Sequence, residues 1–429
     1  MTQSPLRLGI AGLGTVGAGV VRIVQRHGEE IAMRAGRPSE IVAVSARTRD
    51  KDRGVRLNAY SWEDDPVALA KRDDIDVFVE LVGGADGPAK AAAEAAFGAS
   101  KDLVTANKAM LALHGQALAE LAENQDATLK FEAAVAGGIP AIKALREGLA
   151  GNEMTRVMGV MNGTCNYMLT RMEGARLAYD EVFEECQKLG YLEADPKLDV
   201  GGIDAAHKLT LLAAIAFGTR PDFDAMQIEG IEAISIEDIE QAAEMGYRIK
   251  LLGVAEATGR GLETRMMPCL VPHNSGLGSL EGATNMVVYE GDAVGKIALS
   301  GPGAGEGPTA SAVMSDIIDI ARGYRGSTFG KPASMLTKAT WAQASTPAPF
   351  YLRLLLPDRP GTLAKVAAAL GEAGVSINRM RQRDHDAGDA PVLVVTHPTM
   401  RSSLDAALEE MSANGVLVEA PVAIRIETV

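Results

Sequence analysis

Residues 6–17, LRLGIAGLGTVG, place a short apolar run directly before glycines at positions 12, 14 and 17. The run is typical of a buried β-strand, and apolar residues at helical spacing follow the last glycine. The first glycine permits a tight turn, the second lets a pyrophosphate approach the backbone, and the third lets the helix pack closely on the strand. The order strand, glycine turn, helix therefore predicts a Rossmann-type domain; a glycine turn without a ligand is the alternative. The expected cofactor contacts in this loop are Gly12, Leu13, Gly14, Thr15, Val16 and Gly17.

The second strand of this domain is expected at 41–45, IVAVS. A site selective for NAD carries an acidic residue at the end of this strand. Here the strand is followed by Arg47, Arg49 and Lys51, whose cationic groups suit the 2′-phosphate of NADP. We therefore expect NADP(H) to be favoured over NAD(H), with solvated surface arginines as the alternative interpretation.

Further strands are expected at 76–81, 102–105 and 129–134. Open α/β sheets bind ligands at the carboxyl ends of their strands. Thr105 and Lys108 stand at such an end, so we expect both to contact the cofactor; a surface lysine that opens a helix is the alternative. The third of these strands leads into VAGGIP at 135–140, where open backbone carbonyl groups and Glu132 are candidate ligands for a monovalent cation. A plain strand–helix turn explains that pattern nearly as well.

A stretch dense in carboxylates lies in the middle of the chain, at residues 190–208, GYLEADPKLDVGGIDAAHK. Its proline and paired glycines predict a loop, and an apolar helix is expected from Ile203. Asp204 and Lys208 are four residues apart, so they share one helix face. An exposed ion pair is the ordinary interpretation of that spacing. Because the helix that follows is apolar, we expect the pair at a buried polar site instead.

Two further segments carry polar groups or glycines next to a predicted helix. A strand at 154–160 precedes the polar turn that contains Asn162, Gly163 and Thr164, before a helix expected from Tyr167. These groups are candidates to bind a small carboxylate, and helix capping is the alternative.

The second segment, GPGAGEGPT at 301–309, precedes a helix expected at 311–323. A glycine-rich loop at a helix N-terminus can contact an anion, so Gly303 and Gly305 are candidate cofactor contacts. We expect the segment 301–325 to return to the nucleotide-binding domain.

Composition excludes several classes of protein. The 429 residues suffice for two or three domains, and a net charge of −14 argues against nucleic-acid binding. No leader pattern begins the chain and no window is apolar enough to span a membrane. The three cysteines, Cys165, Cys186 and Cys269, give neither a disulfide framework nor metal-ligand spacing, and no histidine lies near Cys165 in sequence to activate it. We therefore expect a cytoplasmic protein without nucleic-acid or membrane partners.

Five stretches, in order along the chain, resemble the homoserine dehydrogenase family. They are VTANKA at 104–109, EAAVAGGIP at 132–140, NGTCNYML at 162–169, GYLEADPKLDVGGIDAAHK at 190–208 and GPGAGEGPTASAV at 301–313. The resemblance implies reversible NAD(P)H-dependent reduction of L-aspartate 4-semialdehyde to L-homoserine in threonine, methionine and isoleucine biosynthesis.

The resemblance also implies roles for individual residues. Lys208 would be the acid/base lysine beside Asp204, and Lys108 would lie near the reacting carbon. Glu193 and Asp199 would bind polar groups of the substrate. The family's monovalent-cation site, for Na⁺ or K⁺, would be matched by Glu132 and the backbone of Val135, Gly137 and Ile139.

The C-terminal part follows a Ser/Thr/Pro-rich segment at 326–348, which we expect to be a linker. Residues 349–429 predict the order β-α-β-β-α-β. The stretches DRPGTLAKV at 358–366 and GVSIN at 374–378 resemble the ACT domain. This resemblance implies a bound amino-acid effector, expected to be threonine, and assembly into a homodimer or homotetramer. A dimerisation module without a ligand is the alternative.

The expected fold class is thus α/β, in three parts. A Rossmann-type dinucleotide-binding domain (1–150, with 301–325 returning to it) precedes an α+β substrate and dimerisation domain (151–300) and a ferredoxin-like ACT domain (349–429). Two other functions fit parts of the sequence. One is an amino-acid sensor that retains an inactive dehydrogenase body. The other is an aspartate-semialdehyde dehydrogenase, which would need an activated cysteine.

Overall fold

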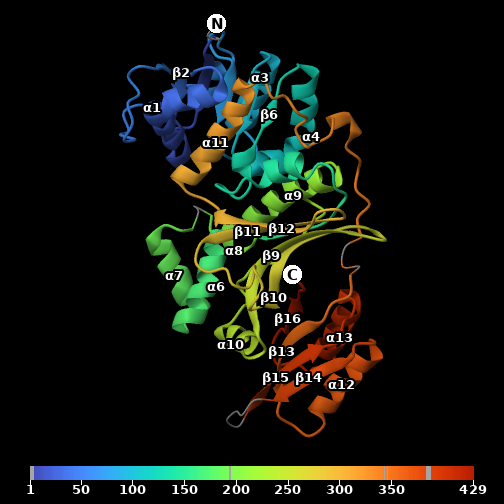
Figure 1. The fold of residues 1–429 in the computed structure, drawn as a ribbon. Helices are drawn as coiled ribbons and strands as arrows, with labels where there is room; N and C mark the ends of the chain where they lie inside the picture. Colours follow the sequence, from blue (N-terminus) through green and yellow to red (C-terminus); the bar gives the residue numbers. More distant parts are fainter. Residues whose placement is uncertain (1–3, 193–194, 343, 345, 383–387) are drawn as a thin grey trace.

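The computed structural model describes residues 4–192, 195–342, 344, 346–382 and 388–429. Figure 1 shows the N-terminal sheet at one end of an elongated molecule, a second sheet in the middle, and the C-terminal domain at the other end. Glu193, a predicted substrate ligand, lies outside the described residues.

The N-terminal sheet has six strands in the order β3-β2-β1-β4-β5-β6, and every pairing is parallel. Its strands are β1 (Leu6–Ala11), β2 (Ser39–Ser45), β3 (Ser61–Glu63), β4 (Val77–Glu80), β5 (Asp102–Thr105) and β6 (Leu129–Lys130). The helices around it are α1 (Thr15–Ala35), α2 (Pro66–Ala70), α3 (Pro88–Gly98), α4 (Lys108–Asn124), α5 (Ala141–Lys143) with the π-helical turn η2 (Ala144–Gly148), and α11 (Glu306–Ala321). This is the doubly wound arrangement that the glycine loop predicts.

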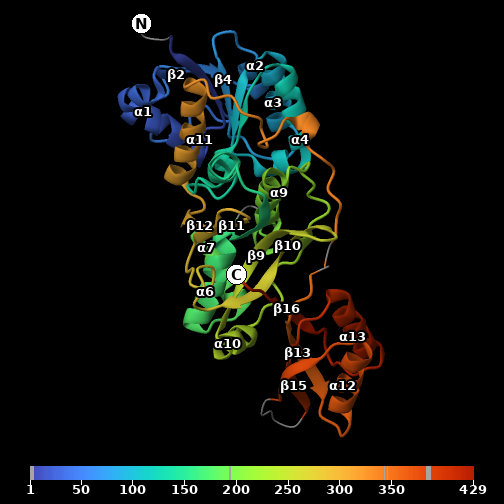
Figure 2. The same ribbon diagram turned by 45° about the vertical axis from the view of Figure 1, so that its right-hand side comes forward.

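Side chains along β1 point alternately to the two faces of this sheet, and a different set of helices covers each face. Leu6, Leu8 and Ile10 belong to the core that includes Val20 of α1 and Val313 of α11. The opposite face forms a core with α2, α3 and α4. Figure 2 shows α11 beside α1, so the segment after residue 301 returns to the first sheet. The helix α11 begins at Glu306 rather than at Ser311.

The last strand of this sheet is shorter than expected. The strand β6 ends at Lys130, and the 3-10 turn η1 (Glu132–Ala134) follows, so the expectation of a strand through Ala134 is wrong. The physical reason is the side chain of Glu132, whose oxygens accept hydrogen bonds from the amides of Ile142 (3.0 Å) and Lys143 (2.8 Å). These bonds hold the chain in a turn at the start of α5.

The middle domain is built on a second sheet, whose strand order is β12-β11-β7-β9-β10. The strands are β7 (Met154–Val160), β8 (Gln227–Ile228), β9 (Tyr247–Thr258), β10 (Gly261–Pro272), β11 (Thr284–Gly291) and β12 (Gly295–Pro302). The helices are α6 (Gly163–Ala175), α7 (Tyr179–Leu189), α8 (Lys197–Val200), α9 (Ile203–Phe217) and α10 (Ile236–Glu244). The buried helix α9 packs on this sheet and on α4, between the two domains (Figure 1).

The C-terminal domain has the β-α-β-β-α-β order that the sequence predicts. Its elements are β13 (Phe350–Pro357), α12 (Thr362–Glu372), β14 (Ile377–Gln382), β15 (Asp389–Thr396), α13 (Arg401–Ala413) and β16 (Val422–Ile426). The strand β16 pairs with β13 and also, in parallel, with β10 of the middle domain. The two sheets are therefore joined edge to edge.

The segment 326–348, expected to be a linker, packs along the other domains. It contains the 3-10 helix η3 (Ala333–Met335). The ring of Phe329 is fully buried, with its centroid 5.4 Å from that of Phe131. Single β-bridges join Thr219 to Thr337 and Leu262 to Trp341.

Candidate active site

The helix α9 begins in a buried position because of Gly202, which precedes it. Gly202 has a φ of 81°, a left-handed conformation that favours glycine. The following turn carries Asp204 and Lys208, which are only 6% and 8% exposed. Their predicted burial is confirmed by these values. An ion pair in such a place is not a solvated surface pair.

Two lysines share the carboxylate of Asp204. Lys208 Nζ lies 2.6 Å from Asp204 Oδ2 and donates to the backbone oxygen of Met161 at 2.8 Å. Lys108, the first residue of α4, places its Nζ 3.0 Å from Asp204 Oδ1. Burial by itself would raise the pKa of Asp204, but the two ammonium groups outweigh it and hold this pKa far below its usual range. Asp204 is therefore a permanent anion between two cations.

Asn162 connects this cluster to a second carboxylate. Its Nδ2 donates to Asp199 Oδ1 (2.9 Å) and to Asp204 Oδ2 (3.1 Å). Its Oδ1 accepts from the amide of Cys165 at 2.8 Å, so Asn162 is the N-cap of α6. The helix consequently begins at Gly163, earlier than the expected Tyr167. One side chain thus fixes both a helix start and two acidic groups.

A cavity of about 630 Å³ lies at this cluster, between the N-terminal and middle domains. Its volume is in the range of sites that hold small molecules and cofactors. Of the predicted site residues, it is lined by Thr15, Val16, Lys108, Gly137, Asn162, Gly163, Thr164, Asp199, Asp204, Lys208, Gly303 and Gly305. Tyr191 and Asn285 also line it; Tyr191 lies within the stretch 190–208 but was not itself predicted as a site residue, and no sequence motif distinguished Asn285.

The glycine loop, residues 12–17, contains the remaining predicted cofactor contacts and has the geometry that a dinucleotide requires. Gly12 has a φ of 94°, and a Cβ there would collide with the backbone of Leu81. A Cβ on Gly17 would collide with the backbone of Gly12, whereas one on Gly14 would meet no atom within 4 Å. Gly12 and Gly17 therefore pack against the backbone, whereas Gly14 faces open space at the N-terminus of α1. In this fold a pyrophosphate binds at that position.

The basic loop after β2 is anchored by an arginine that sequence analysis missed. Arg47, Arg49 and Lys51 are exposed. Arg53 donates its Nε to the backbone oxygen of Leu13 in the glycine loop at 3.0 Å. The guanidinium groups of Arg49 and Arg53 each lie 5.8 Å from the ring centroid of Trp62. Arg53 thus ties the basic loop to the phosphate-binding turn, a contact that no local motif indicates.

Thr105 is buried and does not line the cavity. Its hydroxyl donates to Glu80 Oε2 at 2.5 Å, while Glu80 Oε1 accepts from the amides of Val82 and Gly83. This network holds the turn after β4 against the end of β5.

The proposed cation ligands lie in the turn after η1. Gly137 packs so closely on Gly303 that a Cβ would collide with its backbone. The backbone oxygen of Ile139 already accepts from the amide of Ala141 at 2.7 Å, and Val135 donates its amide to the backbone oxygen of Glu132. In the described part of the chain, no group of three or more His, Cys, Asp or Glu side chains could hold a metal ion.

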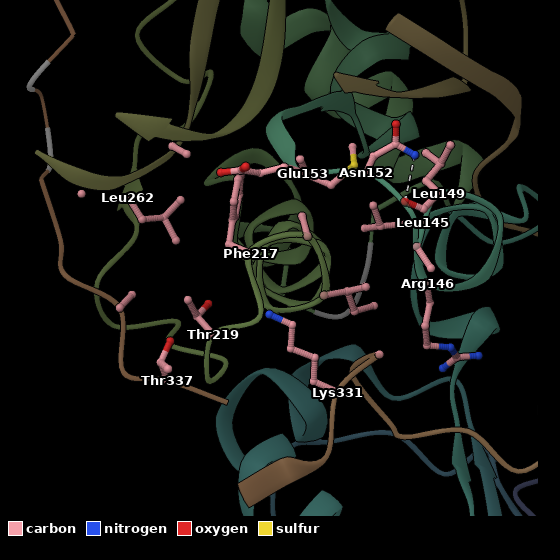
Figure 3. A pocket seen from close by; sticks show the side chains of 18 of the residues that line it. Leu145, Arg146, Leu149, Asn152, Glu153, Phe217, Thr219, Leu262, Lys331 and Thr337 are labelled. Atoms are coloured by element: carbon pink, nitrogen blue, oxygen red, sulfur yellow. Dashed lines mark hydrogen bonds between the residues drawn. The ribbon is translucent and has the colours of Figure 1, made fainter. Parts of the chain in front are cut away.

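A different cavity, of about 690 Å³, lies at the opposite end of α9 (Figure 3). Arg146, Phe217, Thr219 and Lys331 line it, and Lys331 lies beside Gly218, where α9 ends. None of the predicted catalytic residues lines this cavity, whereas Lys108, Asp204 and Lys208 all line the cavity at the start of α9.

A parallel nucleotide-binding sheet whose carboxyl edge faces a buried carboxylate shared by two lysines is the arrangement of an NAD(P)-dependent oxidoreductase. Family models agree on each part. "Homoserine dehydrogenase, NAD binding domain" matches residues 12–132, "Homoserine dehydrogenase" matches 140–318, and "ACT domain" matches 350–415. The chain belongs to the homoserine dehydrogenase family.

Relatives of similar length carry the same name. The homoserine dehydrogenase of Neisseria gonorrhoeae is 42% identical over 99% of both chains, and that of Pseudomonas aeruginosa is 39% identical over the same shares. The structure of a homoserine dehydrogenase from Thiobacillus denitrificans matches with a TM-score of 0.94 at 38% identity, covering 100% of this chain and 99% of the other. A hyperthermophilic archaeal homoserine dehydrogenase mutant in complex with NADPH matches with a TM-score of 0.63 at 26% identity, covering 74% of this chain and 97% of that one.

The described residues contain no helix that is both long and apolar enough to cross a membrane. The fold class and the ACT domain predicted from sequence are confirmed.

Proposed function

We propose that the protein catalyses the reversible reduction of L-aspartate 4-semialdehyde to L-homoserine, in the biosynthesis of threonine, methionine and isoleucine, at the cavity that holds Lys108, Asp204 and Lys208. The observation that carries this proposal is the pair of ammonium groups held on one buried carboxylate beside the glycine loop. An aldehyde oxygen gains negative charge when it is reduced, and preorganised cations stabilise that charge.

The cofactor proposed for this site is NADP(H), in preference to NAD(H). A nicotinamide cofactor whose pyrophosphate binds at the glycine loop would supply or accept the hydride. The open space above Gly14 supports binding of a dinucleotide, and the exposed basic groups of Arg47, Arg49 and Lys51 support the preference for a 2′-phosphate. The archaeal relative in complex with NADPH also supports it.

The residues of this chain would handle the proton and the substrate. Lys208 Nζ uses two of its three N–H groups on Asp204 and Met161 among the described residues, which leaves one to donate to the substrate oxygen. Asp199 would bind the α-ammonium group of the substrate. The N-terminus of α6, at Gly163 and Thr164, offers amide groups for the α-carboxylate.

A direct assay tests the proposal. Oxidation of NADPH is followed with aspartate 4-semialdehyde as substrate, for the wild-type chain and for Lys208→Ala. We expect turnover by the wild type and a loss of about 10²–10⁴ in kcat for the variant, the usual contribution of a positioned acid/base group. Lys188→Ala, in the exposed pair with Glu184, serves as the control. Equal activity of Lys208→Ala and wild type would contradict the proposed role.

Two alternative functions have less support. An aspartate-semialdehyde dehydrogenase needs a reactive thiolate, but burial and the neighbouring Asp199 raise the pKa of Cys165 well above its ordinary value. Its Sγ also lies 3.2 Å from the backbone oxygen of Asp199. Cys165→Ser should therefore retain activity. An inactive sensor is disfavoured by the intact cluster of Lys108, Asp204 and Lys208.

We propose in addition that threonine inhibits the enzyme through the ACT domain. We propose that this domain comprises residues 349–429. The enzyme is proposed to act as a homodimer or homotetramer, since β12 and β14 are edge strands in the described chain. A cytoplasmic location is proposed because Cys165, Cys186 and Cys269 are free thiols.

A monovalent cation near Glu132 completes the proposal. Burial and the neighbouring Asp316 raise the pKa of Glu132 to about 7, and a bound Na⁺ or K⁺ would offset both effects. The backbone oxygens of Val135 and Gly137 are the supporting ligands. Activity in potassium, sodium and tetramethylammonium chloride at equal ionic strength tests this; equal rates in all three would contradict it.

A further inference from the structure

A third cavity, of about 320 Å³, lies between the middle domain and the ACT domain. Gln227, Glu229 and Arg265 line it from the middle domain, and Phe350 and Arg401 line it from the ACT domain. It shares no lining residue with the catalytic cavity. Its volume is at the lower end of the range for small-molecule sites.

The inner wall of this cavity carries charges that neutralise one another. Arg265 binds Glu263 (2.6 Å) and Glu427 (2.8 Å), and all three side chains are buried. Arg425 binds the same Glu427 at 2.9 Å and donates to the backbone oxygen of Thr346. These groups form a closed network.

Three charged residues of the lining stand outside that network: Glu229, Arg401 and Asp405. Among the described residues, the carboxylate of Glu229 has no hydrogen bond and no ion pair. Arg401, on the ACT side, donates only its Nε, to Asp405 Oδ1 at 2.7 Å, and its guanidinium lies 6.0 Å from the ring centroid of Phe350. Burial raises the pKa of Glu229, Arg401 lowers it and Asp405 raises it. A carboxylate and a guanidinium with unused Nη donors therefore line one cavity without binding each other.

We propose that this interdomain cavity binds the zwitterionic head of a small α-amino acid. Arg401 binds the carboxylate and Glu229 binds the ammonium group, so the ligand bridges the two domains. Met267 and Phe350 provide apolar surface for a short side chain. A guanidinium suits a carboxylate because it can donate two parallel hydrogen bonds. The identity of the ligand, threonine, rests on the regulation proposed above, but the site and the ligand class do not.

The position of Glu229 connects this cavity to the catalytic loop. The amide of Ile231 donates to the backbone oxygen of Val200 at 2.9 Å. Between these residues, Gly230 packs so closely that a Cβ would lie 2.5 Å from the same oxygen. Val200 directly follows Asp199 and precedes the glycines that begin α9. A ligand that pulls on Glu229 therefore acts on the segment that positions the acidic groups of the active site.

The experiment uses the full-length chain. The twenty proteinogenic L-amino acids are first compared by thermal shift, and the amino acid that stabilises most is titrated by calorimetry. We expect Arg401→Gln and Glu229→Gln each to weaken its binding at least about tenfold, the loss of a charge-assisted hydrogen bond. Arg381→Gln is the matched control, since Arg381 also joins the ACT domain to the middle domain, through Glu244, but does not line the cavity.

Two ligand analogues assign each contact. The methyl ester of the bound amino acid lacks the carboxylate charge, and its N-acetyl derivative lacks the ammonium charge. The ester should bind worse than the parent compound to the wild type but no worse than the parent to Arg401→Gln. The N-acetyl derivative should bind worse than the parent compound to the wild type but no worse than the parent to Glu229→Gln.

The outcomes separate the inference from the proposed function. Unchanged affinity in both cavity variants overturns the inference. Loss of binding in a further variant, Asp358→Asn, but not in the cavity variants also overturns it, because that result would place the ligand at the turn after β13. Absence of binding for all twenty amino acids also overturns it. Bound amino acid without inhibition by threonine, or without homoserine dehydrogenase activity, supports the site and overturns only the corresponding part of the proposed function.

Discussion

Lys108 and Asp204 belong to different domains and meet at 3.0 Å across the catalytic cavity. Lys108 begins the helix after β5, where ligands of open α/β sheets bind, and Asp204 lies in the first turn of α9. Their ion pair is one direct polar link between the cofactor-binding half and the substrate-binding half.

Replacement of Lys108 by methionine should lower kcat by about 10²-fold or more, because the proposed mechanism loses one of the two ammonium groups that stabilise charge on the aldehyde oxygen. Asp204 keeps its bond to Lys208, so the melting temperature should change by only a few degrees. Steady-state kinetics and thermal unfolding measure the two effects. Lys90→Met on α3 removes a lysine from an i,i+4 pair and is the control. If the variant had the kcat of the wild type, Lys108 would have no role in the mechanism.

Asn162→Asp preserves the shape of the side chain but adds a third carboxylate next to Asp199 and Asp204. We expect kcat/KM to fall at least about tenfold at neutral pH, because like charges repel and the amide donors are lost. The defect should shrink as the pH is lowered, since protonation of the new carboxyl group restores a donor. A pH profile of kcat/KM for both proteins tests this. A defect independent of pH would contradict the electrostatic explanation.

The stability of the protein should fall in mild acid because of His207. Burial lowers the pKa of His207 to about 4, and its ring packs at a tilt against that of Phe223, with the centroids 4.4 Å apart. The unfolded chain takes up a proton near pH 6.5, whereas the folded chain does so only near pH 4. Stability is therefore lost as the pH falls between these values, by about 2 kcal/mol at pH 5.

Denaturant unfolding of wild type and His207→Gln at pH 7 and pH 5 measures this contribution. The variant should lose less free energy of unfolding than the wild type between the two pH values. A steeper loss in the variant would show that other groups control the acid sensitivity.

Arg47→Asp should shift the cofactor preference from NADP toward NAD. A carboxylate at the end of β2 repels a 2′-phosphate and accepts hydrogen bonds from the ribose hydroxyl groups of NAD. The ratio of kcat/KM for the two cofactors measures the shift, which we expect to be at least about tenfold. Arg56→Asp, farther along the same loop, is the control. An unchanged ratio would exclude Arg47 as the group that reads the phosphate.

Sequence patterns predict the elements of this fold well where the residues that determine an element lie close together in the chain. The strand β7 was expected at Met154–Val160 and has those bounds, and α9 begins at Ile203 as predicted. Gly12 and Gly17 are required by close backbone contacts inside a single turn. In each case the evidence lies within a few residues, so periodicity and glycine placement suffice.

Contacts between distant segments could not be predicted in the same way. Asn162, Thr164 and Asn166 are all suitable caps, and only the assembled site shows that Asn162 caps α6 while it binds two carboxylates. Arg53 reaches Leu13 across the nucleotide-binding turn, a relation invisible to any local pattern. The strand expected through Ala134 fails for the same reason, because Glu132 bonds to amides ten or more positions later.

The path of the chain between the first two domains has a mechanical consequence. It crosses from one to the other near residues 149–154, returns near 302–306, and leaves again along 330–341, on the opposite side of the molecule (Figure 1). Two tethers would leave a hinge axis about which the halves could swing. The third, fastened by its β-bridges and by Phe329, restrains that rotation. Ligands should therefore enter and leave mainly through rearrangement of surface segments at the cavity mouth, with the two halves held in a nearly constant relative orientation.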